Sequence, residues 1–174
     1  RKTTKKFRAK MINIHNETAK LLTQDRDILN EIEKEDKGVA NQVKYLNKYA
    51  ASPIYKNTTT KYLSPGEDFF EKLKEELKKA KHYIFMEYFI IQEGVMWDSI
   101  LEILEEKVKE GVDVRLIYDD MGCLRTLPYK YDEKLRQKGI RCLSFNPFVP
   151  FLSVIMNNRD HRKITIIDGH TAFT

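Results

Sequence analysis

The chain has 174 residues, of which 41% are hydrophobic, so it can bury one sizeable core. The net charge of +5 is concentrated at the start, because residues 1–10 hold six of the 31 Lys and Arg residues and no acid. The remaining residues carry 25 basic against 26 acidic side chains, a balance that argues against a nucleic-acid groove in the body of the protein. No apolar run is long enough to span a bilayer.

Two features of the composition leave alternatives open. The basic first ten residues suit an anionic membrane surface or nucleic acid, and a solvated charged tail explains them equally well. Cys123 and Cys142 match no metal-binding or C-x-x-C spacing. We predict two free thiols, with a single disulfide as the alternative.

Residues 1–52 predict a basic, helical N-terminal arm. Apolar residues recur at helical spacing through residues 19–34, a second short helix fits residues 39–49, and Ser52-Pro53 marks the junction. Because the apolar stripe is thin, we expect this arm to be appended to the main core.

Residues 53–174 predict an alternation of helices and strands. Residues 54–63 are rich in Thr and Tyr and could form a short strand or hairpin. Helices are expected at 68–81, 96–110 and 129–138, and strands at 82–91, 112–118, 140–145, 163–167 and from 172. This order predicts an α/β fold: a mixed β-sheet flanked by helices on both faces, parallel at first and ending in an antiparallel hairpin at Asp168-Gly169.

The chemistry is concentrated in the spacing His161-x-Lys163-x4-Asp168. Residues two apart on a strand point to the same face, so His161 and Lys163 should project together. An imidazole can attack phosphorus or move a proton near neutral pH, and an ammonium can neutralise a phosphate oxygen. Asp168 can hold neighbouring groups in place. The alternative is an exposed basic turn before an ordinary buried strand.

Several further stretches accompany this motif. They are Ala80-Lys81-x2-Ile84-x2-Glu87-Tyr88-Phe89-Ile90, Gly111-Val112-x-Val114-Arg115-x2-Tyr118-Asp119-x2-Gly122, Phe145-Asn146-Pro147 and Asn158-Arg159-Asp160-His161-Arg162-Lys163. With them, residues 54–174 resemble the phospholipase D superfamily, whose signature is H-x-K-x4-D, and within it the bacterial cardiolipin synthases.

The resemblance implies a mechanism in which two such motifs meet across one pseudo-twofold site. One His attacks the phosphodiester and becomes a phosphohistidine, and the other protonates the leaving alcohol. His161 would be the nucleophile, Lys163 a phosphate ligand and Asp168 a support for the geometry. The resemblance implies no metal and no cofactor. It also implies a reaction at the cell membrane in which two phosphatidylglycerol molecules give cardiolipin and glycerol.

The departures from the family pattern predict an incomplete site. The sequence contains one H-x-K-x4-D, and it stops at Thr174, before the Gly-Gly-x-Asn run that the family carries. We therefore expect residues 53–174 to be a first phospholipase D-like half-domain, truncated at its C-terminus, soluble without the upstream transmembrane segments of the family and inactive alone. Its expected partners are phosphatidylglycerol or an anionic membrane, and a second H-x-K-x4-D half from the parent chain or a homodimer mate.

Residues flanking the motif are further candidates. Glu87 interrupts an apolar strand, so it could orient His161 by accepting from the imidazole, or it could form a structural ion pair. Asn158, Arg159 and Arg162 could contact an anionic head group, or they could be solvated loop residues.

Asp119 and Asp120 follow a strand, and we interpret them as loop capping with one structural contact rather than as a metal pair. Two other functions stay open. One is a phosphodiesterase or nuclease of the same superfamily that completes its site by dimerisation. The other is a non-catalytic module that binds membranes through the basic tip.

Overall fold

The computed structural model of the chain describes residues 5–148 and 159–174. The chain divides into two compact units, residues 1–61 and residues 62–174. We expected the boundary after residue 52, and residues 53–61 contain neither helix nor strand. The strand or hairpin expected at 54–63 is therefore wrong, because a Thr- and Tyr-rich segment needs a neighbouring strand to pair with.

The N-terminal unit is helical, as expected, with different helix ends. Its helices are α1 (Lys5–Ala19), α2 (Arg26–Glu35) and α3 (Lys37–Ala50). The single helix expected through residues 19–34 is wrong, because α1 ends at Ala19 and α2 begins at Arg26. The carboxylate of Asp25 accepts the backbone N–H groups of Asp27 and Ile28, at 2.8 and 3.4 Å, and caps α2.

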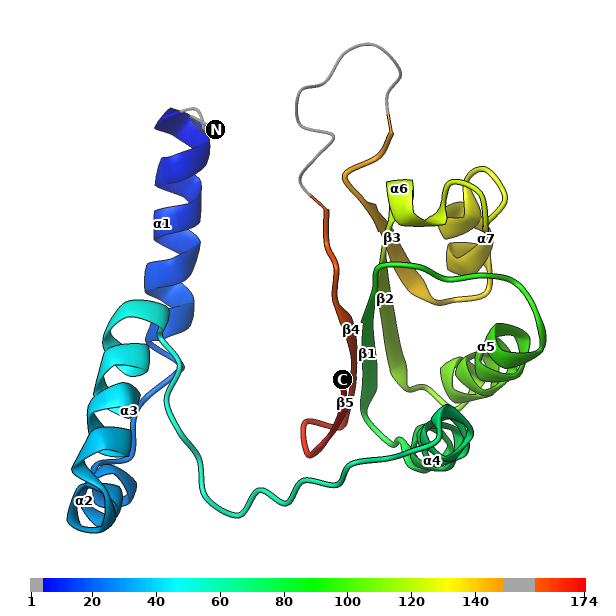
Figure 1. The fold of residues 1–174 in the computed structure, drawn as a ribbon. Helices are drawn as coiled ribbons and strands as arrows, with labels where there is room; N and C mark the ends of the chain where they lie inside the picture. The colour runs from blue at the N-terminus through cyan, green and yellow to red at the C-terminus, as the bar shows by residue number, and fades with distance from the viewer. Residues whose placement is uncertain (1–4, 149–158) are drawn as a thin grey trace. The chain divides into compact units, whose positions relative to one another are not determined.

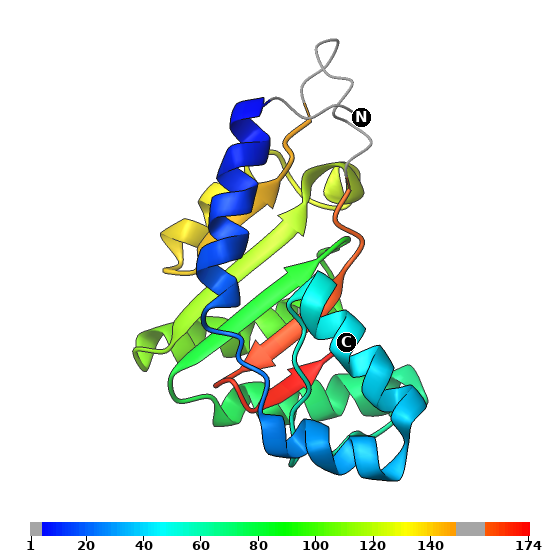
Figure 2. The same cartoon turned by 90° about the vertical axis from the view of Figure 1, so that its left-hand side faces the viewer.

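The second unit contains one mixed sheet (Figures 1 and 2). Its elements are α4 (Gly66–Lys79), β1 (Tyr83–Tyr88), α5 (Val95–Lys109), β2 (Asp113–Asp119), α6 (Asp120–Cys123), α7 (Tyr131–Gln137), β3 (Arg141–Phe145), β4 (Lys163–Ile167) and β5 (Thr171–Phe173). The strand order is β3-β2-β1-β4-β5. Strands β1, β2 and β3 are parallel, whereas β4 is antiparallel to β1 and to β5. The predicted α/β class and mixed sheet are confirmed.

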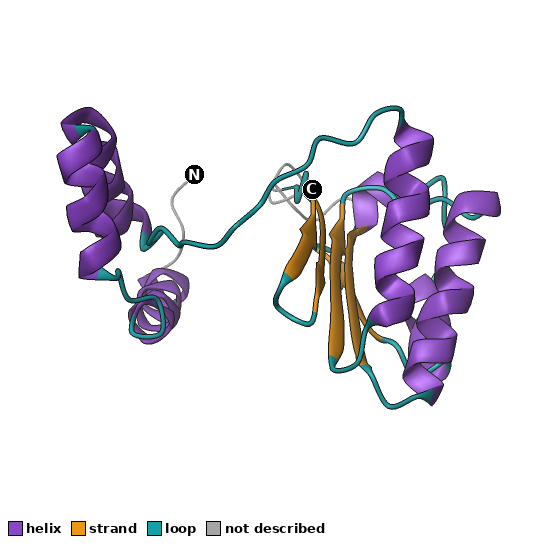
Figure 3. Cartoon of the chain, turned by 90° about the horizontal axis from the view of Figure 1, so that it is seen from below, coloured by secondary structure: helices purple, strands orange, loops and turns teal. Residues whose placement is uncertain are grey.

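The helices of this unit gather on one face of the sheet (Figure 3). Side chains from α4, α5 and α7 form one buried cluster with alternate residues of β1 and β2, such as Ile84, Met86 and Leu116. On the other face Ile117 and Leu143 are 36% and 64% exposed. The expectation of helices on both faces is therefore met on one face only within the described part of this unit.

Strand directions bring four chain segments to one edge of the sheet. The carboxyl ends of β1, β2 and β3 meet there because these strands are parallel, and β4 begins there because it runs the other way. Figure 1 shows this edge at the top of the sheet. The turn at Asp168 and Gly169, with φ values of 51° and 75°, lies at the opposite edge and confirms the predicted hairpin.

Both cysteines are buried and free, as predicted. Burial raises the pKa of the Cys142 thiol to about 12, which keeps it protonated and unreactive at neutral pH. Among the helices that the structure describes, none is both long and apolar enough to cross a bilayer.

Candidate active site

His161 and Lys163 meet at the edge of the sheet where β4 begins. The ammonium nitrogen of Lys163 lies 3.0 Å from Nε2 and 3.3 Å from Nδ1 of His161, so it can donate to whichever nitrogen carries the lone pair. Both side chains are exposed. The spacing of two residues along an extended chain places them on the same face, and the structure brings them together as the sequence predicts.

Phe89 forms an aromatic contact with this pair. The centroids of the Phe89 and His161 rings are 4.6 Å apart with an angle of 65° between the planes, an edge-to-face arrangement. The ammonium of Lys163 lies 5.7 Å from the centroid of the Phe89 ring. Sequence reasoning missed Phe89, because in a run of apolar residues it reads as one more buried strand position.

Asp119 holds the segment that leads into His161. Its carboxylate is fully buried and accepts hydrogen bonds from Nη1 of Arg159 and from the backbone N–H groups of Asp160 and Gly122, each at 3.0 Å. The capping role predicted for Asp119 is confirmed by the Gly122 bond. The ion pair with Arg159 and the bond to Asp160 give Asp119 a second role. They connect the end of β2 to the residue before His161.

The flanking residues predicted to contact a head group have other contacts. Arg159 binds Asp119, and its side chain is 17% exposed. Arg162 is 64% exposed and pairs with Glu87 at 3.0 Å and with Asp160 at 3.6 Å. Asn158 lies outside the described residues.

Glu87 faces away from His161, so of the two roles left open for it the structure shows the ion pair and does not show contact with the imidazole. In the antiparallel pairing Tyr88 lies opposite Lys163 and Glu87 lies opposite Ile164, so Glu87 projects on the other face of the sheet. There its Oε1 accepts from Arg162 at 3.0 Å. The neighbouring Asp160 carboxyl and partial burial raise the pKa of Glu87, and Arg162 opposes them.

Asp168 lies at the far end of β4, away from His161 and Lys163. Lys163 and Asp168 are five residues apart, or about 16 Å along an extended strand. The carboxylate of Asp168 accepts the backbone N–H groups of Lys81, His82 and Tyr83, each at 2.8 Å. Burial raises the pKa of Asp168, but these three donors outweigh it and leave the pKa below its ordinary value. Asp168 therefore anchors β4 against the start of β1.

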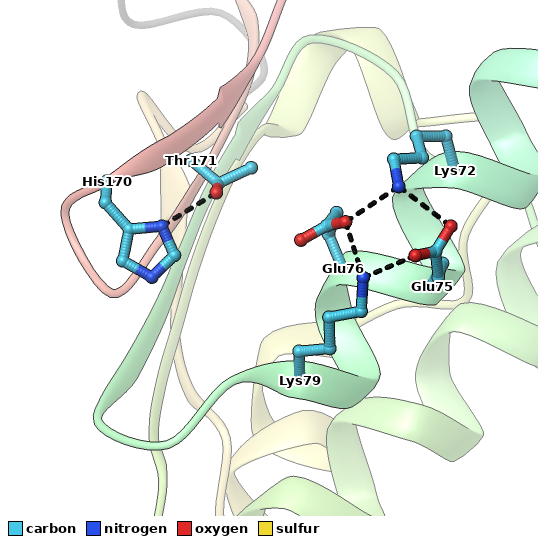
Figure 4. A network of polar contacts seen from close by, with 6 residues as sticks. All are labelled: Lys72, Glu75, Glu76, Lys79, His170 and Thr171. Atoms are coloured by element: carbon cyan, nitrogen blue, oxygen red, sulfur yellow. Dashed lines mark hydrogen bonds and ion pairs between the residues drawn. The ribbon is translucent and has the colours of Figure 1, made fainter. Parts of the chain in front are cut away.

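Other features of this unit do not join the pair. His170 is in the β4–β5 turn and bonds to Thr171 at 2.8 Å (Figure 4). A cavity of about 580 Å³ opens beside the ends of β2 and β3, and its lining includes neither His161 nor Lys163. Within residues 5–148 and 159–174, no group of three or more His, Cys, Asp or Glu side chains is arranged to hold a metal ion.

The chain that carries this exposed His161–Lys163 pair is similar to proteins of one known family. The family described as "Cardiolipin synthase, PLD-like domain" matches residues 73–174. The chain belongs to this family. A cardiolipin synthase of Geobacillus sp. (strain WCH70) is 42% identical over 123 residues, which are 70% of this chain and 24% of that protein.

One further sequence relative extends the likeness over more of the chain. A Streptococcus mutans protein is 46% identical over 149 residues, 86% of this chain and 32% of its own length. The crystal structure of Nuc, a phospholipase D family member from Salmonella typhimurium, has a TM-score of 0.42 at 20% identity and covers 60% of each chain. The chain thus spans 24% and 32% of the lengths of these two sequence relatives.

Proposed function

We propose that the parent protein is a phosphatidyltransferase that converts two phosphatidylglycerols into cardiolipin and glycerol, with His161 as a nucleophile. The observation that carries the proposal is the exposed His161–Lys163 pair, with 3.0 Å between Nζ and Nε2, in a chain that belongs to the cardiolipin synthase family. Relatives named cardiolipin synthase support the substrate class.

In the proposed first step, an unprotonated ring nitrogen of His161 attacks the phosphorus of phosphatidylglycerol. A nitrogen–phosphorus bond forms as the bond from phosphorus to the glycerol oxygen breaks, and glycerol leaves after taking up a proton. In the second step a hydroxyl of another phosphatidylglycerol attacks the phosphohistidine and gives its proton to the group that protonated glycerol. The nitrogen–phosphorus bond breaks, which releases His161 and gives cardiolipin. Lys163 binds a phosphoryl oxygen and neutralises charge that develops on it.

The described half of the site supplies one imidazole and one ammonium. The proton for the leaving glycerol requires a second acid, and the phosphoryl group has further oxygens to bind. We propose that a second H-x-K-x4-D motif supplies both, from another part of the parent chain or from a dimer mate. This half alone should therefore not turn over phosphatidylglycerol. The complete enzyme should act at the cell membrane, where its substrate is.

The remaining candidate residues take positional roles in this proposal. Asp168 fixes β4 from its far end, and Asp119 fixes the segment before His161 through Arg159 and Asp160. Glu87 lies beside Asp160 and pairs with Arg162, whose backbone carbonyl accepts the N–H of Phe89 at 2.9 Å. Because Arg162 is the more exposed of the two arginines, it is the better candidate to meet an anionic head group.

Substitution of His161 in the parent protein tests the proposal. We expect His161→Ala to abolish cardiolipin formation from phosphatidylglycerol and to prevent the trapping of an acid-labile phosphoenzyme. The matched control is His15→Ala, since His15 is an exposed histidine of α1. Cardiolipin formation by His161→Ala at the rate of the control would overturn the proposal. Hydrolysis of phosphodiesters or DNA in place of transfer would point to a nuclease or phosphodiesterase instead.

A further inference from the structure

The ring of Phe89 touches both members of the His161–Lys163 pair. It meets the imidazole edge to face, with the centroids 4.6 Å apart, and lies 5.7 Å from the ammonium nitrogen. Phe89 is half-buried, whereas His161 and Lys163 are exposed. One partly buried ring therefore forms an apolar wall beside two side chains that would otherwise project into solvent.

The backbone of Phe89 is held from two sides. Its N–H donates to the carbonyl oxygen of Arg162 at 2.9 Å, which joins it to the segment before β4. On the other side, the thiol of Cys123 lies 3.7 Å from the carbonyl oxygen of Phe89 and accepts the N–H of Ile91 at 3.2 Å. Residues 89–91 are thus fastened between the motif segment and α6.

Gly122 in α6 approaches Phe89 so closely that a side chain cannot fit. A Cβ at this position would lie 2.2 Å from the carbonyl oxygen and 3.1 Å from ring atom Cε2 of Phe89. The φ of Gly122 is not in the left-handed region, so its backbone conformation does not require glycine. The lack of space for a Cβ does. Its N–H donates to Asp119, whose other oxygen accepts from Asp160, the residue before His161.

We propose that Phe89, set in place by the close approach of Gly122, is a positioning residue for the imidazole of His161. Its ring limits the rotation of the imidazole and of the Lys163 side chain, so that both face the same phosphoryl group. Nucleophilic attack depends on the alignment of the reacting atoms, so loss of the ring should slow the chemical step more than it weakens substrate binding. The inference rests on the proposed role of His161 as nucleophile.

Two pairs of variants in the full-length parent protein test this inference. Phe89→Leu removes the ring and keeps an apolar side chain, and Gly122→Ala displaces Phe89 without changing it. The control for the first is Phe85→Leu, which removes a half-buried ring from the face of β1 opposite Lys163. The control for the second is Gly66→Ala, where a Cβ would meet no atom within 4 Å. For each protein, kcat and KM for phosphatidylglycerol in mixed micelles and the midpoint of thermal unfolding are measured.

We expect Phe89→Leu and Gly122→Ala each to lower kcat about tenfold, with KM changed by less than about twofold. Phe89→Tyr keeps the ring, so the kcat of this variant should stay within about twofold of the wild-type value. The double variant should be no slower than the slower single variant, because both changes act on one contact. The two controls should keep the wild-type kcat.

The outcomes separate this inference from the proposed function. If His161→Ala is inactive while Phe89→Leu keeps the wild-type kcat, the positioning role is wrong and the nucleophile stands. If His161→Ala is fully active, the proposed function fails whatever Phe89 does. If Phe89→Tyr lowers kcat as much as Phe89→Leu does, the positioning role of the ring is also wrong. If Gly122→Ala does not fold, the comparison of Phe89→Leu with Phe89→Tyr decides alone.

Discussion

The two ends of β4 are each held by an aspartate that accepts three hydrogen bonds, and only one of these ends carries the His161–Lys163 pair. At the far end Asp168 binds three successive backbone N–H groups of residues 81–83. At the near end Asp119 binds two backbone N–H groups and Arg159. Asp168 belongs to the H-x-K-x4-D motif and lies away from the His161–Lys163 pair, whereas Asp119 is outside the motif and holds the segment that carries the pair.

The exposed His161–Lys163 pair is held mainly through the backbone of its segment. His161 and Lys163 have few contacts of their own, so the segment that carries them must be fixed through its backbone. Asp119 is fully buried and Asp168 is partly exposed. Loss of a hydrogen-bond partner should therefore lower the free energy of unfolding more at Asp119 than at Asp168, because a buried charge without a partner is costly.

The largest expected effect comes from the buried anchor. We expect Asp119→Ala to lower the free energy of unfolding by about 3 kcal/mol, because Arg159 loses its carboxylate and two backbone donors lose their acceptor. Urea denaturation measures this change. The neighbouring Asp120→Ala is the control and should cost about 1 kcal/mol, since among the described residues its carboxylate accepts one backbone N–H, that of Phe148 at 2.7 Å. Equal losses would remove the distinction between the two residues.

The reactive end should affect rate and leave stability unchanged. We expect Lys163→Met in the parent protein to lower kcat about 100-fold, because a charge that neutralises a phosphoryl oxygen is removed. The unfolding midpoint should not move, since Lys163 is exposed. Lys81→Met is a matched control, because Lys81 is an exposed lysine at the far end of the sheet. A wild-type kcat for Lys163→Met would contradict the proposed phosphate contact.

The far end should show the reverse pattern. We expect Asp168→Ala to lower the free energy of unfolding by about 1–2 kcal/mol, after allowing for the partial exposure of the carboxylate. Asp168→Asn should cost less, because asparagine keeps one acceptor oxygen and tolerates the φ of 51°. The activity that remains should follow the folded fraction. A 100-fold loss of kcat in fully folded Asp168→Asn would place Asp168 in the chemistry.

The same carboxylate predicts a pH dependence of stability. The folded-state pKa of Asp168 lies below its ordinary value, so its contribution is fully present above that ordinary value and is lost as the pH falls through the folded-state pKa. The difference in unfolding free energy between wild type and Asp168→Asn should therefore shrink below about pH 4. Urea denaturation between pH 2.5 and pH 7 measures it, and a constant difference would exclude this origin.

The smallest effect is expected on the surface of α4. Lys72 and Lys79 both bind Glu75 and Glu76 (Figure 4), and these hydrogen bonds lower the pKa of Glu75 to about 2. We expect Lys79→Ala to raise the pKa of Glu75 toward its ordinary value in an NMR titration. The unfolding midpoint should barely change, because exposed ion pairs are screened by water and salt. A large drop in that midpoint would show that the network supports the fold.

Local sequence patterns determined much of this protein. Apolar periodicity located the helices and strands after residue 68 except the short helix α6, since a buried strand and an amphipathic helix each leave a pattern in consecutive residues. The spacing of His161 and Lys163 determined that they share a face, because alternation along a strand is a local property. The arm was harder to predict, because Asp25 interrupts a helical pattern that otherwise appears continuous.

The tertiary structure decided which residues surround that pair. The register between β1 and β4 turned Glu87 to the opposite face and gave it Arg162 as a partner. Strand direction carried Asp168 to the far edge and brought Asp119 to the segment before His161, across 41 positions of sequence. Phe89 and Gly122 meet only when α6 packs on the end of β1. Such contacts join residues distant in the chain, and consecutive residues carry no record of strand register or helix packing.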